Sequence, residues 1–470
     1  MGIVSDAAYA IVAVIVAFVA ITLLLSIPIK ILWRTLSIVS FLNLPATLLP
    51  IGYTESIGLS GILRSARQLT PMLRRMIPWL LIALTIISLL MYTRSSTPNV
   101  AVFSAIGLAT LFTSIALASG AVRQGIDVVR LTVLPIAPIA IVQAVSTIVF
   151  RFSPTLEETY LRSAVASFLL GDDARLLYTT RPNNVTDPLK AGGILFVNGN
   201  RASMVMAVLA LLYLSLWIRR RSFTLFVLFA VCIAGELTTS SKTALVLSIS
   251  IPFVFLILPN AIRSGRRQGT AVAGVLALSA TGVGLWLLYS KLPSFIAGTD
   301  EAAQSRSAIF AGWITYFREH PIAGLGFGGW AERWARDAAS YGSSPRYPPH
   351  NFLLLEWANT GLVGCFTVIA LMLALVWGYL KLVRRAETSR DARVLSLQLG
   401  AIVWIFLHGM YDNTSFYGTS NTLIIFAALI AQMLVLTDER TGRVASEGRY
   451  ASGDLRSATP ARLRGGRIER

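Results

Sequence analysis

His350 and Asn351 end a Tyr-Pro-Pro-His-Asn run that stands immediately before a long apolar segment. The polar stretch 291–350 precedes this segment, and the neighbouring hydrophobic segments predict that it lies on the outer side of a membrane. A neutral imidazole can accept a proton near neutral pH. At this boundary His350 could remove a proton from a water-borne group beside a group held in lipid. A structural role at the start of the segment is the alternative.

Three cations stand at similar places in the predicted topology. Lys242 follows the Thr-Thr-Ser-Ser turn 238–241, Arg201 follows Asn200 at the start of another apolar segment, and Arg306 lies in a predicted helix. A cation near hydrocarbon costs free energy unless it faces the protein interior, an anion or the headgroups. Lys242, Arg201 and Arg306 could together neutralise a diphosphate, and snorkelling to the headgroups is the alternative.

The predicted helix around Arg306 covers residues 302–319 and ends before Pro321. One stripe of this helix carries Arg306, Phe310, Trp313 and Phe317. An arginine aligned with three aromatic rings is expected to face protein or the membrane surface rather than open water.

A glycine-rich run follows this helix. Residues 324–329 match G-x-G-x-x-G, but no strand precedes them and no βαβ unit surrounds them, so a dinucleotide site is not indicated. Gly324 and Gly326 instead predict a loop that folds back tightly over the membrane, or main-chain amides that approach a phosphate.

The two other histidines have structural interpretations. His320 stands at the end of the predicted helix as a polar capping residue. His408 lies four residues before Asp412, and a hydrogen bond between them would close a helix end. No acidic or histidine pattern has the spacing of metal ligands, so we expect neither a metal nor another cofactor. Cys232 and Cys365 lie inside predicted helices and are interpreted as buried thiols.

The composition predicts an all-α polytopic membrane protein. The chain has 470 residues, of which 55% are hydrophobic and only 14% are charged. Long apolar runs must satisfy their backbone hydrogen bonds internally, so in a membrane they form helices. We expect twelve spans: residues 7–29, 32–52, 77–92, 99–119, 131–150, 193–217, 222–238, 243–259, 270–290, 351–380, 395–411 and 421–437.

The basic residues predict the orientation. With twelve spans, all arginine-rich short loops fall on one face, which the positive-inside rule makes cytoplasmic. Both termini are then cytoplasmic, and the long stretches 151–192 and 291–350 lie outside. We therefore expect one membrane domain, residues 1–437, and a disordered basic tail, residues 438–470. The net charge of +18 comes mainly from these loops and the tail, so nucleic-acid binding is not indicated.

Several of these motifs together resemble the O-antigen ligase and polymerase family. The resemblance rests on His320-Pro321-Ile322-Ala323-Gly324-Leu325-Gly326-Phe327-Gly328, on Pro349-His350-Asn351-Phe352-Leu353 with Glu356 and Gly361-Leu362-Val363-Gly364, on Val197-Asn198-Gly199-Asn200-Arg201-Ala202, and on Ser240-Ser241-Lys242-Thr243. It covers roughly residues 190–440. A large outer loop between the ninth and tenth spans, a GT-C-like arrangement, fits the same family.

The resemblance implies a metal-independent, inverting glycosyl transfer outside a bacterial cytoplasmic membrane. The donor would be a glycan linked to undecaprenyl diphosphate, and the acceptor a hydroxyl of another glycan or glycolipid. His350 would be the loop histidine proposed as catalytic base, and Arg306 the arginine that precedes it. Lys242 stands where ligases usually have arginine, so the charge is kept and the bidentate fork is lost.

The remaining site residues follow from this interpretation. Lys242, Arg201, Asn200 and Arg306 would bind the donor diphosphate. Gly324, Gly326, Asn351, Glu356 and Asp412 would shape the acceptor site and its loop. Ligase and polymerase differ in acceptor and stay open alternatives. A transporter of lipid-linked sugars and a non-catalytic scaffold of an envelope-synthesis complex are the other two.

Overall fold

The computed structural model describes residues 28–42, 76–170, 191–196, 198–263, 293–345, 347–412 and 414–453, without the side chains of 293–305, 420 and 439–453. Throughout these ranges the regular structure is helical, and no β-strand is present in them. The helices are α2 (Ile29–Leu42), α4 (Met76–Leu90), η1 (Met91–Arg94), α5 (Pro98–Arg123), α6 (Val128–Val133), α7 (Ala137–Phe152), α8 (Pro154–Leu161), α9 (Ala164–Leu170), α12 (Gly199–Arg220), α13 (Phe223–Thr238), α14 (Lys242–Arg263), α16 (Pro293–Glu319), α17 (Gly329–Asp337), η2 (Ala338–Tyr341), α18 (Phe352–Arg384), α19 (Ser389–Gly409) and α20 (Ser420–Gly453).

Seven of the described helices are long and apolar enough to cross a membrane, or eight if the bent pair α7 and α8 is one span. The shorter apolar helix α13 packs among them. The chain is therefore an all-α polytopic membrane protein, as predicted. The predicted span 270–290, nearly all of 7–29 and the second half of 32–52 lie outside the described residues, so the count of twelve stays a prediction.

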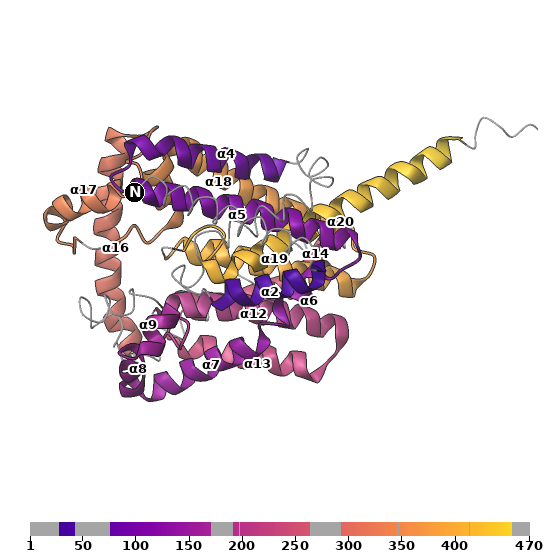
Figure 1. Cartoon of the computed structure of the whole chain (residues 1–470), viewed down its shortest axis with the longest axis horizontal. Helices are drawn as coiled ribbons and strands as arrows, with labels where there is room; N and C mark the ends of the chain where they lie inside the picture. The colour runs from indigo at the N-terminus through magenta and orange to yellow at the C-terminus, as the bar shows by residue number, and fades with distance from the viewer. Residues whose placement is uncertain are drawn as a thin grey trace, which may run out of the picture.

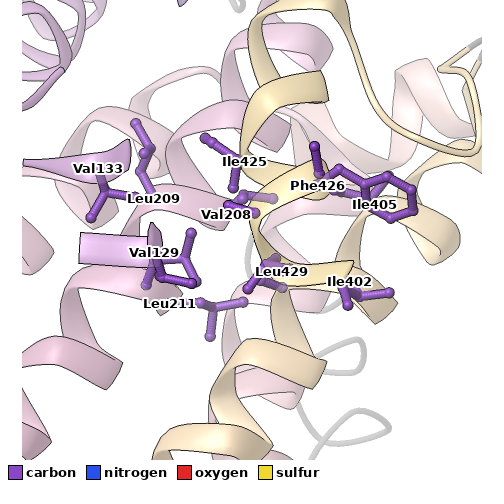
Figure 2. Close-up of a cluster of buried hydrophobic side chains, with 14 of the residues drawn as sticks. Val129, Val133, Val208, Leu209, Leu211, Ile402, Ile405, Ile425, Phe426 and Leu429 are labelled. Carbon is purple, nitrogen blue, oxygen red and sulfur yellow. The ribbon is translucent and has the colours of Figure 1, made fainter. Parts of the chain in front are cut away.

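The centre of the bundle is built by α12, α19 and the first half of α20, which are buried on nearly every side. Figure 2 shows their side chains meeting those of α6 in one apolar cluster. Its labelled members are Val129, Val133, Val208, Leu209, Leu211, Ile402, Ile405, Ile425, Phe426 and Leu429. Alanines line both α12 and α20, and small residues let membrane helices approach closely. This rigid centre fixes the ends of α12 and α19.

One end of the bundle carries the two predicted outer segments. We call it the His350 end: α12, α14 and α18 begin there, and α13 and α19 finish there. The short helix α8 bends away from α7 by 120°. The long helix α16 runs across this end, roughly perpendicular to the spans, with α17 beside it (Figure 1). The predicted helix over 302–319 is confirmed as part of α16.

Three predicted helices differ from the structure. The predicted span 131–150 is broken between α6 and α7, because Pro135 has no N–H and clashes with a continuing helix. Within the outer stretch 151–192, the sequence around residues 156–170 predicts one short helix, and the structure forms two, α8 and α9. The span predicted at 193–217 begins as a helix only at Gly199, since main-chain groups of 192–195 bond to α7 and α8 side chains, including Gln143 and Glu157.

Two long helices also depart from expectation. α18 covers the predicted span 351–380, but Gly361 is non-helical (φ 71°) and divides it into two parts. α20 continues to Gly453, so helix extends into the segment predicted to be a disordered tail; no proline interrupts residues 438–453. Residues 454–470 lie outside the described range.

Candidate functional site

Two of the predicted site residues bind neighbouring carbonyls in the connection between α19 and α20. The Asn351 side-chain amide donates to the Met410 carbonyl at 3.2 Å. The Arg306 guanidinium donates to the Tyr411 carbonyl at 3.4 Å. Because Met410 and Tyr411 are consecutive, α16 and the start of α18 meet at two adjacent peptide units. Arg306 and Asn351 are thus bound to adjacent main-chain carbonyls, and their part in a common site stays a prediction.

His350 stands immediately before α18 and is held in an unusual conformation. Asn351 caps the helix, and its side-chain oxygen accepts hydrogen bonds from the amides of Leu353 and Leu354 at 2.9 and 3.2 Å. His350 itself has φ of 49°, in the left-handed region that costs a non-glycine residue about 1–2 kcal/mol. Its half-buried ring lies 6.1 Å from that of Tyr347. Strained residues of this kind concentrate at functional sites.

The cationic turn between α13 and α14 lies against the start of α12. A Cβ added at Gly199 would stand 2.9 Å from the Thr239 carbonyl oxygen, so the two main chains touch. Lys242 is the first residue of α14, and Arg201 is exposed in the first turn of α12. Two helix N-termini thus meet beside two cations, and both the helix dipoles and the side chains favour an anion there.

Backbone conformation marks the same turn. Ser240, two residues before Lys242, has φ of 56°. Only three non-glycine residues of the described chain have positive φ, and Ser240 and His350 are two of them. Both lie at the His350 end, one beside the predicted diphosphate-binding cation and the other at the predicted base.

His408 and Asp412 connect the cationic turn to the His350 region. The His408 ring is fully buried at the end of α19, and its Nδ1 lies 3.3 Å from the Thr414 hydroxyl. Its electrostatic neighbours are the Asp412 carboxylate and the main chain of Asn200. The first turn of α12, which holds Asn200, therefore contacts the last turn of α19, and α19 leads directly into the connection that Asn351 and Arg306 bind. The structure brings all these predicted residues to one end of the bundle.

The glycine loop after α16 makes its close contacts with protein main chain. A Cβ at Gly324 would lie 2.2 Å from the Trp357 carbonyl, and the next amide, that of Leu325, donates to Ala358 at 2.7 Å. A Cβ at Gly326 would lie 2.5 Å from the Arg94 carbonyl. These glycines therefore permit the tight folding that the sequence predicted, while their part in acceptor binding stays a prediction.

Glu356 and the aromatic stripe lie on the other side of this loop. Glu356 accepts a hydrogen bond from Thr360 at 2.8 Å, one turn before the break at Gly361. Trp313 packs edge-on against Trp357, with 5.7 Å between ring centroids, and Phe317 packs at 5.3 Å from the same ring. Most of the stripe thus faces protein, as expected, and Phe310 is half exposed. Cys232 and Cys365 are free thiols, and Cys365 is only partly buried.

Sequence reasoning missed the groups that join these parts. Met410 and Tyr411 act through their carbonyl oxygens, and any residue type supplies a carbonyl, so no motif could have marked them. Ser95, Ser96 and Thr97 hold the main chain of Phe327 through side-chain and backbone hydrogen bonds. Their Ser-Ser-Thr run between two apolar segments could have been read as an exposed turn, but its partner lies more than 200 residues away.

The fold and this polar cluster define a class: a multi-pass α-helical membrane protein with a histidine and several cations gathered at one end. A family model described as O-antigen ligase matches residues 227–369 of this chain, which supports assignment to the O-antigen ligase and polymerase family. The matched range contains Lys242, Arg306, His350 and Glu356. No curated protein matches the chain. Family and helices together indicate a ligase- or polymerase-type enzyme of polysaccharide biosynthesis in the inner membrane.

Proposed function

We propose that this protein transfers a glycan from an undecaprenyl-diphosphate carrier to a hydroxyl group of a glycan or glycolipid acceptor, with inversion and without a metal ion. The observation that carries the proposal is the convergence of Arg306 and Asn351 on the carbonyls of Tyr411 and Met410. It brings a guanidinium to the backbone that anchors the residue next to His350. A cation for a leaving diphosphate and a base for an attacking hydroxyl then share one site.

In this mechanism the cations hold the donor. A guanidinium has five N–H donors, more than the single bond from Arg306 to Tyr411 uses. Lys242 and Arg201 stand at two helix N-termini, which add to the positive potential. As the bond between the anomeric carbon and the diphosphate oxygen breaks, its electron pair moves to the diphosphate. Fixed positive groups stabilise that developing charge.

His350 supplies the proton transfer. The acceptor hydroxyl attacks the anomeric carbon from the side opposite the diphosphate while its proton passes to the neutral imidazole. One displacement inverts the configuration, and undecaprenyl diphosphate leaves with the electron pair of the broken bond. General-base catalysis contributes roughly 10²–10⁴-fold to such a step. The Asn351 cap orients the residue that bears the base, and solvent then removes the proton from the imidazole.

The proposal is tested by reconstitution with an undecaprenyl-diphosphate-linked glycan and candidate acceptors, with product size and linkage as the readout. His350→Ala should lower transfer by at least about a hundredfold and leave donor binding intact. His320→Ala is the matched control, because His320 is an exposed histidine at the same end of the bundle and should be dispensable. Full transfer by His350→Ala would remove the imidazole from the chemistry.

The same assay separates the alternatives. A ladder of product lengths identifies a polymerase, and one attachment per acceptor identifies a ligase. Arg306→Ala should weaken competition by a diphosphate lipid, and unchanged competition would return Arg306 to a structural role. Movement of the donor across the membrane without any new glycosidic bond would identify a transporter and overturn the proposal.

A further inference from the structure

A cavity lies at the end of the bundle opposite His350, between the last turns of α14 and α18. Its volume is about 710 Å³. One wall is apolar and consists of Leu258, Ile262, Trp377 and Leu380. The Trp377 side chain is 61% exposed, so this wall is open to whatever surrounds the bundle. Because α18 begins at the His350 end and finishes here, the cavity is separate from the proposed glycosyl-transfer site.

The rim of the cavity is cationic. Lys381, Arg384 and Arg385 line it, and all three are exposed. Lys381 Nζ stands 5.2 Å from the centre of the Trp377 ring, which joins the charged rim to the apolar wall. No acidic residue of the described chain lines the cavity, and none of these three cations forms an ion pair with another described residue.

We propose that this cavity binds one anionic phospholipid, with its phosphate on Lys381, Arg384 and Arg385 and an acyl chain along Trp377 and the aliphatic wall. Basic pockets between membrane helices bind anionic headgroups in this manner. The cationic rim and the apolar wall together favour an anionic lipid over other ligands. An inorganic phosphate would use only the rim, and a zwitterionic lipid would use only the wall. The site is independent of the proposed function.

A segment of the same chain is the rival occupant. Residues 264–292 follow Arg263 at this end of α14, and they begin with two further arginines, Arg266 and Arg267. The Arg263 guanidinium is itself bound to Ser389 Oγ and the Glu387 carbonyl, both at 3.3 Å. Adding this cationic stretch to a cationic rim is unfavourable, whereas an anionic lipid complements it. Charge complementarity therefore favours the lipid.

The test uses the full chain in phosphatidylcholine vesicles with increasing fractions of phosphatidylglycerol brominated on its acyl chains. Bromine quenches tryptophan fluorescence at short range, and the part due to Trp377 is the difference between the native chain and Trp377→Phe. We expect saturable quenching of Trp377 by brominated phosphatidylglycerol. Brominated phosphatidylcholine at the same mole fraction should quench it less.

Charge-matched variants assign the site. Lys381→Gln/Arg384→Gln removes two rim charges and should raise the half-saturating lipid fraction about thirtyfold, at about one power of ten per 1.4 kcal/mol. Arg390→Gln/Arg393→Gln removes two exposed charges that lie at the same end of the bundle but outside the cavity. This variant should leave the half-saturating lipid fraction unchanged. Circular dichroism of each variant confirms that it is folded.

Four results would overturn the proposal. Equal quenching of Trp377 by both lipids would make it an ordinary lipid-facing residue. Equal effects of the two charge-matched variants would reduce the rim to a general surface attraction. Displacement of the brominated lipid by millimolar inorganic phosphate would identify a free-anion site. Absence of any quenching of Trp377 would mean that protein, such as residues 264–292, covers the cavity.

Discussion

Asn351 offers the sharpest test of how the site is positioned, because its two functions can be removed separately. Its side-chain oxygen caps α18 through the amides of Leu353 and Leu354, and its side-chain nitrogen donates to the Met410 carbonyl. Asn351→Asp keeps a capping oxygen and loses the amide donor. Asn351→Ala loses both. Comparing the two variants therefore isolates the bond to Met410.

The expected magnitudes follow from these contacts. Loss of an asparagine cap costs about 1 kcal/mol, and loss of one hydrogen bond about 1 kcal/mol more. Asn351→Ala should then lower the free energy of unfolding by about 2 kcal/mol, and Asn351→Asp by about half of that. Without the bond to Met410, the left-handed strain of His350, about 1–2 kcal/mol, favours relaxation to negative φ. The left-handed conformer of His350, which presents the imidazole for proton transfer, should then be populated about tenfold less.

Two measurements check this reasoning. Thermal unfolding in detergent should rank the native chain above Asn351→Asp and Asn351→Ala last. In the reconstituted transfer assay, kcat should fall about tenfold in both variants, while the affinity for the donor lipid stays unchanged, because the cations are intact. A native kcat in Asn351→Asp would show that the bond to Met410 does not position His350, whatever happens to stability.

Two further predictions concern the segments around the site. Burial raises the pKa of the Glu157 carboxyl from 4.5 to about 7, against a smaller lowering by the Gly192 amide. The folded chain thus keeps a proton that the unfolded chain loses above pH 4.5, so the stabilisation is complete below that pH and is lost as the pH rises through about 7. Glu157→Gln should flatten this pH dependence of thermal unfolding, whereas Glu158→Gln should retain it; an unchanged profile in Glu157→Gln would contradict the assignment. Gly324→Ala should lower the free energy of unfolding by about 3 kcal/mol. The cost has two sources: alanine is strained in the left-handed backbone conformation of Gly324, and its Cβ would displace the hydrogen bond from the Leu325 amide to the Ala358 carbonyl. Unaltered thermal unfolding of Gly324→Ala would contradict this close packing.

The helical architecture was predictable because long apolar runs have few alternatives in a membrane. The helix over 302–319 was also predictable, since its aromatic spacing and Pro321 define a stripe and an end. Pro135 could have marked the break between α6 and α7, but the apolar run around it concealed it. Gly361 gave no such warning, because its positive φ depends on the loop that packs against α18.

The candidate site was predictable in residue types and unpredictable in geometry. His350 and the cations stood out as polar groups at the ends of apolar segments. The approach of Arg306 to Asn351 depends on the carbonyls of Met410 and Tyr411, which no sequence pattern reveals. The strain at His350 was equally hidden, because a φ angle is imposed by the Asn351 cap and its partner rather than by the imidazole.

The docking of Phe327 limits how far this protein can be divided. Its amide donates to the Ser95 hydroxyl, and its carbonyl accepts from the Ser96 hydroxyl and the Thr97 amide. All three partners lie outside residues 227–369. A fragment cut to the family-matched range would thus lose the peptide contacts that seat its own glycine loop. The smallest autonomous unit must include the connection between α4 and α5, so complementation by co-expressed halves should succeed only when both halves can meet there.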